Sequence, residues 1–237
     1  QGYFLAVTPG TKFVSLGGAI AADVHGKNHH MDGCFSEFVL EFSLMNELGE
    51  ALICSRTQNS ELFWATIGGM GLTGIILSAK IKLRNIETAY IRQESIKAEN
   101  LDEIFMLFEQ SDDWSYYVAW IDCLQRGSKK GRSILMRGEH ALRSELPKTL
   151  QNNPLTVKKR KLPAIPFDFP GFALNEWTVK LFNYFYFCRQ RAKTQTSIID
   201  YDTFFFPLDA ISGWNRIYGK NGFIQYQMVL PKARGKE

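Results

Sequence analysis

The sequence predicts an α+β fold with antiparallel sheets, built from two successive parts. Apolar residues alternate along several segments, which is the pattern of half-buried strands. Helical spacing of apolar residues is confined to short stretches near residues 60–67 and 101–108. Few helices are therefore expected, above all in the second part.

The composition is that of a folded globular chain. Apolar residues make up 45% and charged residues 22% of the 237 positions, which excludes global disorder. A formal net charge of +4 is too small to indicate nucleic-acid binding, so we expect no nucleic acid partner. Four widely spaced cysteines exclude a disulfide scaffold and a zinc ribbon, and indicate free thiols in a reducing compartment.

The first part begins with a stretch rich in glycine and small residues, over 8–34, where no regular amphipathic helix is expected. A hairpin follows, with strands at 38–46 and 51–55. Asn59 or Ser60 caps a short helix that ends at Gly68-Gly69. The next segment, 75–84, is a half-buried strand, and one face of it is expected to carry Ile75, Leu77, Ala79, Ile81 and Leu83.

The polar residues at 85–88 are the predicted boundary between the two parts. Beyond them, Asn100 caps a helix, with Glu103 at the capping-box position. The remaining expected elements are strands at 116–123, 133–137, 203–206 and 223–230.

Two glycine motifs bear on function. Residues 69–74 match G-x-G-x-x-G, but a helix precedes them and a strand follows, the reverse of the dinucleotide-binding order. A tight glycine-rich corner is therefore the better interpretation. The segments 9–11 and 17–19 supply unhindered backbone N–H groups, which either bind an anion such as a pyrophosphate or belong to a solvent-exposed loop.

Residues 25–30 contain three histidines and Lys27. His25 and His29 have the i, i+4 spacing of a helical metal pair, but Gly26 disfavours a helix and no cysteine or carboxylate set completes a site. We expect no metal. A site that handles negative charge and protons suits these residues better, and a turn with structural histidines is the alternative.

Three polar or aromatic side chains in the second part are candidates for a pocket. Gln225 and Gln227 share one face of the predicted last strand with Phe223 and Val229, so they either bind hydroxyl groups in a cavity or face water. Trp120 is either a core residue or a pocket wall.

A basic run at 158–161 precedes a segment rich in proline and aromatic residues, 162–170. The segment is either a solvated loop or a contact with a membrane surface or an amphiphilic substrate.

The sequence resembles the PCMH-type FAD-binding oxidoreductases of the vanillyl-alcohol-oxidase family over nearly its whole length. The segments that carry the resemblance are 9–11, 15–30, 61–69, 71–76, 119–120, 207–209, 214–216 and 222–227. The block His25-Gly26-Lys27-Asn28-His29-His30 is the most specific of them. The Gly-Gly-Ala-Ile and His-Gly elements alone also fit sugar-lactone oxidases.

The resemblance implies a fold, a cofactor and a set of site residues. Residues 1–87 would form the second half of an FAD-binding domain, and residues 88–237 part of an antiparallel-sheet substrate (cap) domain. FAD would be contacted by Gly10, Ser15, Leu16, Gly17, Gly18, Ala22, Asp23, Val24, His25 and Ile76. His25 and Lys27 would be catalytic. The substrate side would be lined by Lys27, Trp120, Phe205, Gln225 and Gln227, with Phe205 standing where relatives carry a tyrosine.

The implied reaction is hydride transfer from a sugar hydroxyl carbon to flavin N5, which gives a keto sugar. A polyprenyl-phosphate-linked pentose is the leading substrate; an aldonolactone or sugar alcohol is the alternative, and a non-catalytic nucleotide- or lipid-binding role is another. A reductase partner that completes an epimerisation, a cytoplasmic location and peripheral contact at the inner membrane face are further expectations. The resemblance also implies family segments before and after this chain, so we expect weak or no FAD binding and no turnover from these residues alone.

Overall fold

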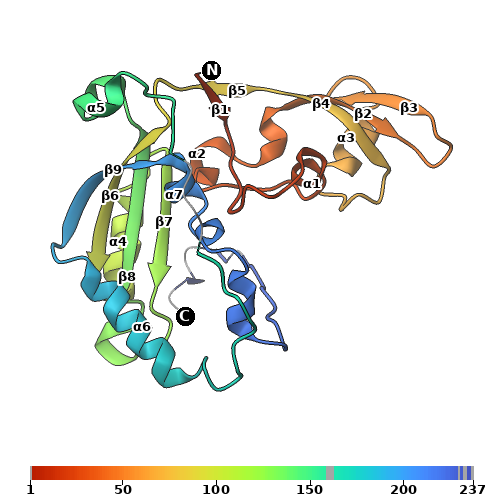
Figure 1. The fold of residues 1–237 in the computed structure, drawn as a ribbon. Coiled ribbons are helices and arrows are strands. Elements are labelled where there is room, and N and C mark those ends of the chain that lie inside the picture. Colours follow the sequence, from red (N-terminus) through yellow and green to blue (C-terminus); the bar gives the residue numbers. More distant parts are fainter. Residues whose placement is uncertain (1, 159–162, 229, 232–233, 236–237) are drawn as a thin grey trace.

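The computed structural model describes residues 2–158, 163–228, 230–231 and 234–235, and its fold is α+β with antiparallel sheets, as predicted (Figure 1). Three sheets are present among these residues: a two-stranded, a three-stranded and a four-stranded sheet. The first two lie in the N-terminal part and the third in the C-terminal part.

The N-terminal sheets are built on a hairpin. Strand β2 (Val39–Met45) lies between β3 (Ala51–Ser55) and β4 (Ile75–Ile81), and β1 (Tyr3–Leu5) pairs with β5 (Leu83–Asn85). The predicted hairpin and the predicted strand after residue 74 are therefore confirmed. The helices of this part are α1 (Leu16–Ala21), α2 (His29–Asp32), the 3-10 helix η1 (Phe35–Phe38) and α3 (Ser60–Thr66).

One face of the three-stranded sheet carries the N-terminal core. Ile20 of α1 and Phe63 of α3 pack over Phe42 and Leu44 of β2, and the rings of Phe42 and Phe63 stack with centroids 5.1 Å apart. All four side chains are buried. This packing fixes the two helices over the sheet, because it removes their apolar side chains from water.

The predicted inward face of β4 was wrong at its start. Ile75 and Leu77 are exposed, whereas Ile76 packs on the core with Ala79 and Ile81. The register explains the switch, since Leu44 pairs with Ile76 but Ser43 pairs with Ser78, which leaves Leu77 as an extra residue. A bulge of this kind reverses the alternation of side chains along a strand.

The G-x-G-x-x-G segment is a tight corner between α3 and β4, as the sequence predicted. Gly74 has φ +144°, and a Cβ added there would lie 2.4 Å from the Met45 carbonyl oxygen. The backbone of β2 therefore leaves no room for a side chain at this position.

The C-terminal sheet has the strand order β7-β8-β6-β9, with helices on both faces (Figure 1). Helix α4 (Leu101–Glu109) buries Ile104 and Leu107 against Leu135 of β8 on one face. Helix α6 (Glu176–Arg189) lies on the opposite face, where Tyr186 contacts Trp120 of β7. The strands are β6 (Tyr90–Ala98), β7 (Tyr116–Ile121), β8 (Ser133–His140) and β9 (Thr194–Asp200). The short elements are α5 (Lys148–Gln151), α7 (Tyr201–Phe205) and the 3-10 helices η2 (Gly127–Lys129), η3 (Arg143–Glu145), η4 (Leu208–Ala210) and η5 (Trp214–Tyr218).

The predicted cap of α4 is confirmed with one change. The Asn100 side chain accepts a hydrogen bond from Glu103 N at 3.0 Å. The Glu103 carboxylate accepts from Glu99 N at 2.7 Å, one residue before the position that a capping box would use.

Two predicted strands of the C-terminal part were wrong. Residues 203–206 lie in or directly after helix α7, because Asp200 accepts hydrogen bonds from the Thr203 backbone and hydroxyl and so starts a helix. Residues 223–228 and 230 form no strand, and Val229 lies outside the described residues. No neighbouring strand pairs with that segment in the described part of the chain, and Ile224 is 97% exposed.

Several elements were not predicted. Helix α1 forms despite Gly17 and Gly18, because Ser15 caps it by accepting a hydrogen bond from Gly18 N at 3.0 Å. Strands β6 and β9 carry too many polar residues to stand out by alternation, yet β6 is central, between β8 and β9. Helix α6 contains six aromatic residues among its fourteen, which hid its helical spacing, but Asn175 and Thr178 form a reciprocal capping box at its start.

Candidate active site between the glycine-rich segment and the C-terminal sheet

The glycine-rich segment lies directly against strand β4. A Cβ added at Gly17 would be 3.6 Å from Cβ of Ile76. The structure therefore brings the Ser15–Gly18 stretch together with Ile76, although they are about sixty residues apart in sequence. Both were predicted as cofactor contacts.

The surface of this segment is open where the predicted cofactor contacts lie. No atom would lie within 4 Å of a Cβ at Gly10, and Ala22 and His25 are exposed. Leu16 and the neighbouring Phe13 also present apolar side chains to solvent. A flat apolar ligand with an anionic group could cover such a surface, because it offers apolar contact beside unhindered backbone.

Asp23 fixes the turn that follows α1. It has φ +40°, and its carboxylate accepts hydrogen bonds from Ser36 N at 2.9 Å and from the Ser36 hydroxyl at 3.2 Å. These bonds hold Ala22, Asp23 and Val24 in place, and His25 then pairs with Cys34 in an isolated β-bridge. The exposed His25 ring is therefore carried by an ordered backbone.

Gly26 lets the chain pass close to the segment after β1. A Cβ at this position would lie 2.8 Å from the Thr8 carbonyl oxygen and 2.7 Å from Asn28 Oδ1. Any larger residue would push the His25–Lys27 backbone away from Thr8. The glycine thus positions the two predicted catalytic side chains on either side of it.

His25 meets the end of the chain. The Gln227 side-chain amide nitrogen lies 3.1 Å from His25 Nε2. The two residues are separated by 202 positions, and both were predicted to belong to one site. Gln225 and Gln227 are both exposed. The prediction that they share one face of a strand does not apply, because residues 223–228 form no strand.

Lys27 is half-buried where the glycine-rich segment meets α7 and β7. Its Nζ donates a hydrogen bond to the Phe204 carbonyl oxygen and lies 4.6 Å from the centre of the Phe204 ring. Its own carbonyl oxygen accepts from Tyr117 N at 2.9 Å, which ties the residue to β7. Burial lowers the pKa of Lys27 to about 8, because desolvation disfavours the ammonium form.

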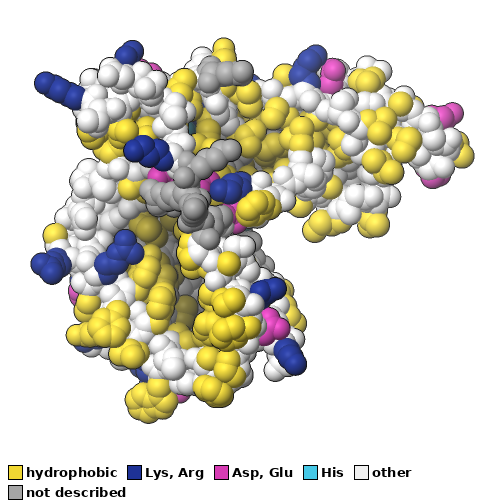
Figure 2. Space-filling view, viewed as in Figure 1, with side chains coloured by type: hydrophobic (Ala, Val, Ile, Leu, Met, Phe, Trp, Pro, Cys, Tyr) yellow, Lys and Arg dark blue, Asp and Glu magenta, His cyan; other side chains and the backbone are white. Residues whose placement is uncertain are grey.

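The face of the C-terminal sheet that carries Trp120 is hollowed (Figure 2). Trp120 is half-buried, and its ring packs against Tyr186 at a centroid distance of 4.6 Å. Val118 of β7 and Met136 of β8 are directly paired and lie on the same face, and both are half-buried. Trp120 therefore forms part of the surface between the sheet and α6.

Phe205 has a different environment from the other predicted substrate residues. It is 1% exposed, and its ring packs among Phe4, Tyr116 and Phe204. Its carrier helix, α7, still lies beside the site, because Lys27 Nζ is 5.9 Å from the Phe205 ring centre. A substrate contact by this ring stays a prediction.

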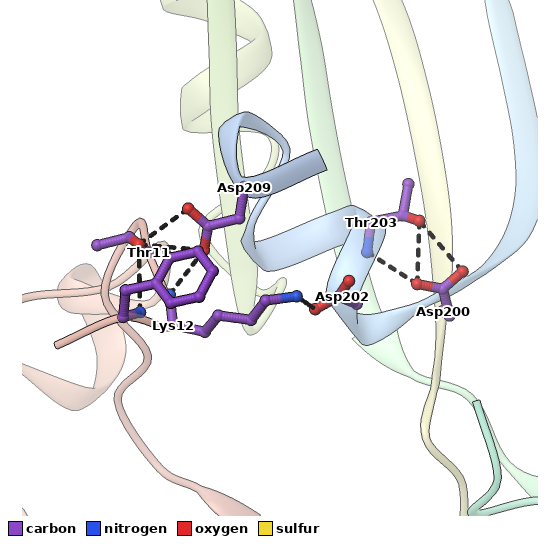
Figure 3. A network of polar contacts seen from close by, with 7 residues as sticks. Thr11, Lys12, Asp200, Asp202, Thr203 and Asp209 are labelled. Carbon is purple, nitrogen blue, oxygen red and sulfur yellow. Dashed lines mark hydrogen bonds and ion pairs between the residues drawn. The ribbon is translucent and has the colours of Figure 1, made fainter. Parts of the chain in front are cut away.

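A polar clasp joins the glycine-rich segment to the chain after α7 (Figure 3). The Thr11 hydroxyl donates to Asp209 at 2.9 Å, and Lys12 N donates to the same carboxylate at 2.8 Å. Lys12 Nζ forms an ion pair with Asp202 at 2.5 Å. Asp209 is only 6% exposed, so its two hydrogen bonds are sheltered from water.

Sequence reasoning gave no role to Thr11 or Asp209. Both stand within segments that carry the family resemblance, and this was the only available signal. Their contact depends on the folded arrangement, since they are 198 residues apart.

A second polar cluster fixes helix α2 under the site. Arg84 forms an ion pair with Asp32 at 2.5 Å and donates to the Tyr116 hydroxyl at 3.2 Å. Burial raises the pKa of Tyr116 to about 12, and burial together with Arg84 lowers the pKa of His140 to about 4. Both side chains are therefore neutral near pH 7, which suits their aromatic surroundings.

Comparison with known proteins finds oxidases and dehydrogenases among the relatives. The chain is 37% identical over its whole length to decaprenylphosphoryl-β-D-ribose oxidase of Mycolicibacterium smegmatis, of which it covers 52%. It is 37% identical over 70 residues to cytokinin dehydrogenase 2 of Arabidopsis thaliana, which is 30% of this chain and 14% of that protein. It is 31% identical over 87 residues to D-arabinono-1,4-lactone oxidase of Debaryomyces hansenii, which is 37% of this chain and 15% of that protein.

The full-length match is of a different kind from the two shorter ones. The match to decaprenylphosphoryl-β-D-ribose oxidase covers all of this chain but only about half the length of that oxidase. The two shorter matches cover about a third of this chain and a small part of each relative. No family model matches the chain.

Proposed function

We propose that the chain belongs to the family of FAD-linked oxidoreductases that includes these relatives, and that it contributes to the oxidation of a sugar hydroxyl to a keto sugar. The proposed substrate is a polyprenylphosphoryl ribose, as in the name of the relative that matches the whole chain. The N-terminal part, to about residue 87, would belong to the FAD-binding domain and the rest to the substrate domain.

The residues present fit FAD. Backbone N–H groups at Gly10 and at Ser15, Leu16 and Gly17 would hold the diphosphate, since unhindered N–H groups favour anions, whereas the Gly18 N–H already donates to the Ser15 hydroxyl. Ile76 and Leu16 would supply apolar contact to the rings. Ala22, Asp23, Val24 and His25 would follow as backbone and side-chain contacts. When bound, FAD would supply a hydride acceptor at its N5 atom.

The roles of the side chains follow from their positions. Lys27 lies where a desolvated amine, partly neutral near pH 8, can accept the proton of the substrate hydroxyl. His25 is held by Gln227 and would orient the sugar through hydrogen bonds of its ring nitrogens. Trp120 would pack against the apolar part of the substrate, and Gln225 and Gln227 would bind its hydroxyls.

The observation that carries this proposal is the meeting of His25 with Gln227. Neither residue is distinctive alone, but they come from the two ends of the chain and meet beside the open glycine-rich surface.

The experiment is spectroscopic and uses the complete polypeptide. We expect the purified protein to show flavin absorbance and to reduce a redox dye when polyprenylphosphoryl ribose is added. Reduction by an aldonolactone in place of the lipid-linked sugar would select the second candidate, which the D-arabinono-1,4-lactone oxidase match supports. A colourless protein that binds no FAD would contradict both.

The clasp at Asp209 predicts a specific loss of cofactor. Asp209→Ala removes the acceptor of Thr11 and Lys12 N, so the segment that carries Gly10 is freed. We expect FAD affinity to fall roughly tenfold, since two sheltered hydrogen bonds contribute about 1 kcal/mol each. Titration of the apoprotein with FAD, followed by fluorescence, measures the change.

Asp202→Ala is the matched control for that variant. It stands seven residues away and removes only the partially exposed ion pair to the Lys12 side chain. Exposed ion pairs contribute little, so FAD affinity should stay within about twofold of wild type. Equal losses in both variants would argue against a special role for Asp209.

Gln227→Ala and His25→Ala should separate substrate binding from cofactor binding. We expect Gln227→Ala to raise the substrate KM roughly tenfold with little change in flavin content, since it loses hydrogen bonds to the substrate and to His25. His25→Ala should mainly lower flavin retention. Steady-state kinetics and absorbance ratios measure both, and release of flavin by Gln227→Ala would contradict the assignment.

A further inference from the structure

Helix α6 is anchored to the C-terminal sheet by one side. Asn183 Nδ2 donates to the buried carboxylate of Asp122 at 2.7 Å. Phe187 is buried, and its ring lies 4.1 Å from Lys97 Nζ and 4.5 Å from the Arg132 guanidinium. These contacts fix the rotation of the helix about its axis, and with it the residues that face outward.

The outward side of α6 is apolar and aromatic. Its residues follow the helical spacing i, i+4, i+7 and i+8: Trp177, Leu181, Tyr184 and Phe185. Trp177 is 79% and Phe185 is 62% exposed, and Phe172, just before the helix, is 79% exposed. Figure 2 shows hydrophobic side chains gathered at this end of the molecule. We call the four helix residues together with Phe172 the aromatic stripe.

Basic residues accompany the aromatic stripe. Segment 171–193 contains one acidic residue, Glu176, and four basic ones: Lys180, Arg189, Arg191 and Lys193. Glu176 is paired with Lys180 at 2.6 Å, and Lys193 is paired with Glu103 at 2.5 Å. The positive charge next to the exposed aromatic rings therefore comes from Arg189 and Arg191, at the C-terminal end of the segment.

We propose that the aromatic stripe of α6 docks on an anionic phospholipid bilayer. Tryptophan, tyrosine and phenylalanine beside arginine and lysine are the residues of helices that lie in the membrane interface. The arginines at the end of the aromatic stripe carry the charge that complements anionic headgroups. Among the described residues, every helix is too short or too polar to span a bilayer.

The position of α6 relates this surface to the site. Tyr186, on the anchored side, packs on Trp120 of the hollowed sheet face. A lipid-linked sugar could therefore remain partly in the bilayer while its sugar reaches the sheet. This role rests on the proposed function, whereas the docking itself rests only on the surface of α6. The basic run that the sequence first suggested for membrane contact falls mostly outside the described residues, at 159–161.

The test uses the fluorescence of Trp177 to report contact between the aromatic stripe and lipid. The complete polypeptide is mixed with vesicles of equal parts phosphatidylcholine and phosphatidylglycerol, whose acyl chains carry bromine, a contact quencher of tryptophan fluorescence. We expect quenching in wild type, loss of the quenched component in Trp177→Phe, and unchanged quenching in the control Trp64→Phe. Trp64 is also partly exposed, but it stands on α3, in the N-terminal part.

A second variant measures the affinity. Leu181→Ser with Phe185→Ser should lower vesicle co-sedimentation by at least about tenfold, since each side chain contributes about 1.5–3 kcal/mol on burial. Leu48→Ser with Leu72→Ser, exposed residues of the N-terminal part, should leave it unchanged. Circular dichroism checks that both double variants are folded.

Several outcomes would overturn the proposal. One is equal binding to vesicles of phosphatidylcholine alone, and another is quenching that survives in Trp177→Phe. A third is that Leu181→Ser with Phe185→Ser changes the oligomeric mass of the protein instead of its vesicle binding. Shielding of Trp177 from acrylamide without lipid would show that other parts of the polypeptide cover it. Flavin reduction by a detergent-solubilised substrate reports on the proposed function separately, so failure of docking alone leaves that proposal standing.

Discussion

Replacing Lys27 by methionine is expected to lower kcat by about 10²–10⁴-fold while FAD remains bound. The buried amine is the one predicted proton acceptor whose environment is tuned for the task, since burial lowers its pKa to about 8. Methionine keeps the length and apolar contact of the side chain against Phe204 but cannot take a proton. Stopped-flow reduction of the flavin by substrate measures the effect.

The pH profile distinguishes a proton acceptor from a packing residue. In wild type the rate of flavin reduction should rise with pH and level off above about 8, where the Lys27 amine is neutral. The residual rate of Lys27→Met should lack this step. A variant with wild-type kcat, or one that retains the same step in its pH profile, would show that Lys27 does not accept the proton.

Lys27→Met is expected to stabilise the fold although it lowers kcat. The pKa of Lys27 is lower in the folded protein than its value of 10.5 in an exposed lysine, so the folded state disfavours the charged form. Wild-type stability therefore increases as pH rises from about 8 toward 10.5. We expect Lys27→Met to raise Tm at pH 7 and to lose most of this gain near pH 10. Lys12→Met, at the partly exposed ion pair with Asp202, is the control and should show no such pH-dependent gain.

The second large effect is expected at Asp122, which is fully buried at the end of β7. Its carboxylate accepts hydrogen bonds from Arg132 at 2.6 Å, Asn183 at 2.7 Å and Gln125 at 3.0 Å. Asp122→Ala leaves the Arg132 guanidinium buried without this carboxylate and releases α6. We expect the free energy of unfolding to fall by about 3–5 kcal/mol, as for other broken buried ion pairs. Urea denaturation monitored by circular dichroism measures it.

A double-mutant cycle identifies the cause. Asp122→Ala with Arg132→Met removes both charges, so the pair should be less destabilised than the sum of the two single variants. Strict additivity would mean that the pair contributes little and that Asp122 acts only through Asn183. Asn183→Ala, which removes one amide donor, should cost only about 1–2 kcal/mol.

Low pH should weaken the attachment of α6 through Asp122 and Asn183. Burial alone would raise the pKa of Asp122, but the hydrogen bonds from Arg132, Asn183, Gln125 and Leu124 N outweigh it and lower the pKa. The carboxylate therefore stabilises the fold above its ordinary value of 3.8 and loses this contribution as pH falls below that value. Hydrogen exchange of α6 amides should accelerate in this range before that of β2.

The sequence by itself determined several of the local elements. The hairpin, the cap at Asn100 and the glycine corner at 69–74 follow from turn chemistry and side-chain spacing, which act between near neighbours. The predicted cap of α3 was wrong, because Asn59 precedes the helix without a capping hydrogen bond from its side chain. The motif around His25 and Lys27 was enough to indicate an FAD-linked oxidoreductase.

Only the tertiary structure decided what those residues contact. The bulge at Leu77, in the pairing of β4 with β2, reversed the buried face of β4. The pairing of His25 with Gln227 and of Thr11 with Asp209 joins residues about two hundred positions apart. Such contacts depend on how the sheets pack and pair, and a pattern that spans a few residues carries no information about a partner that distant.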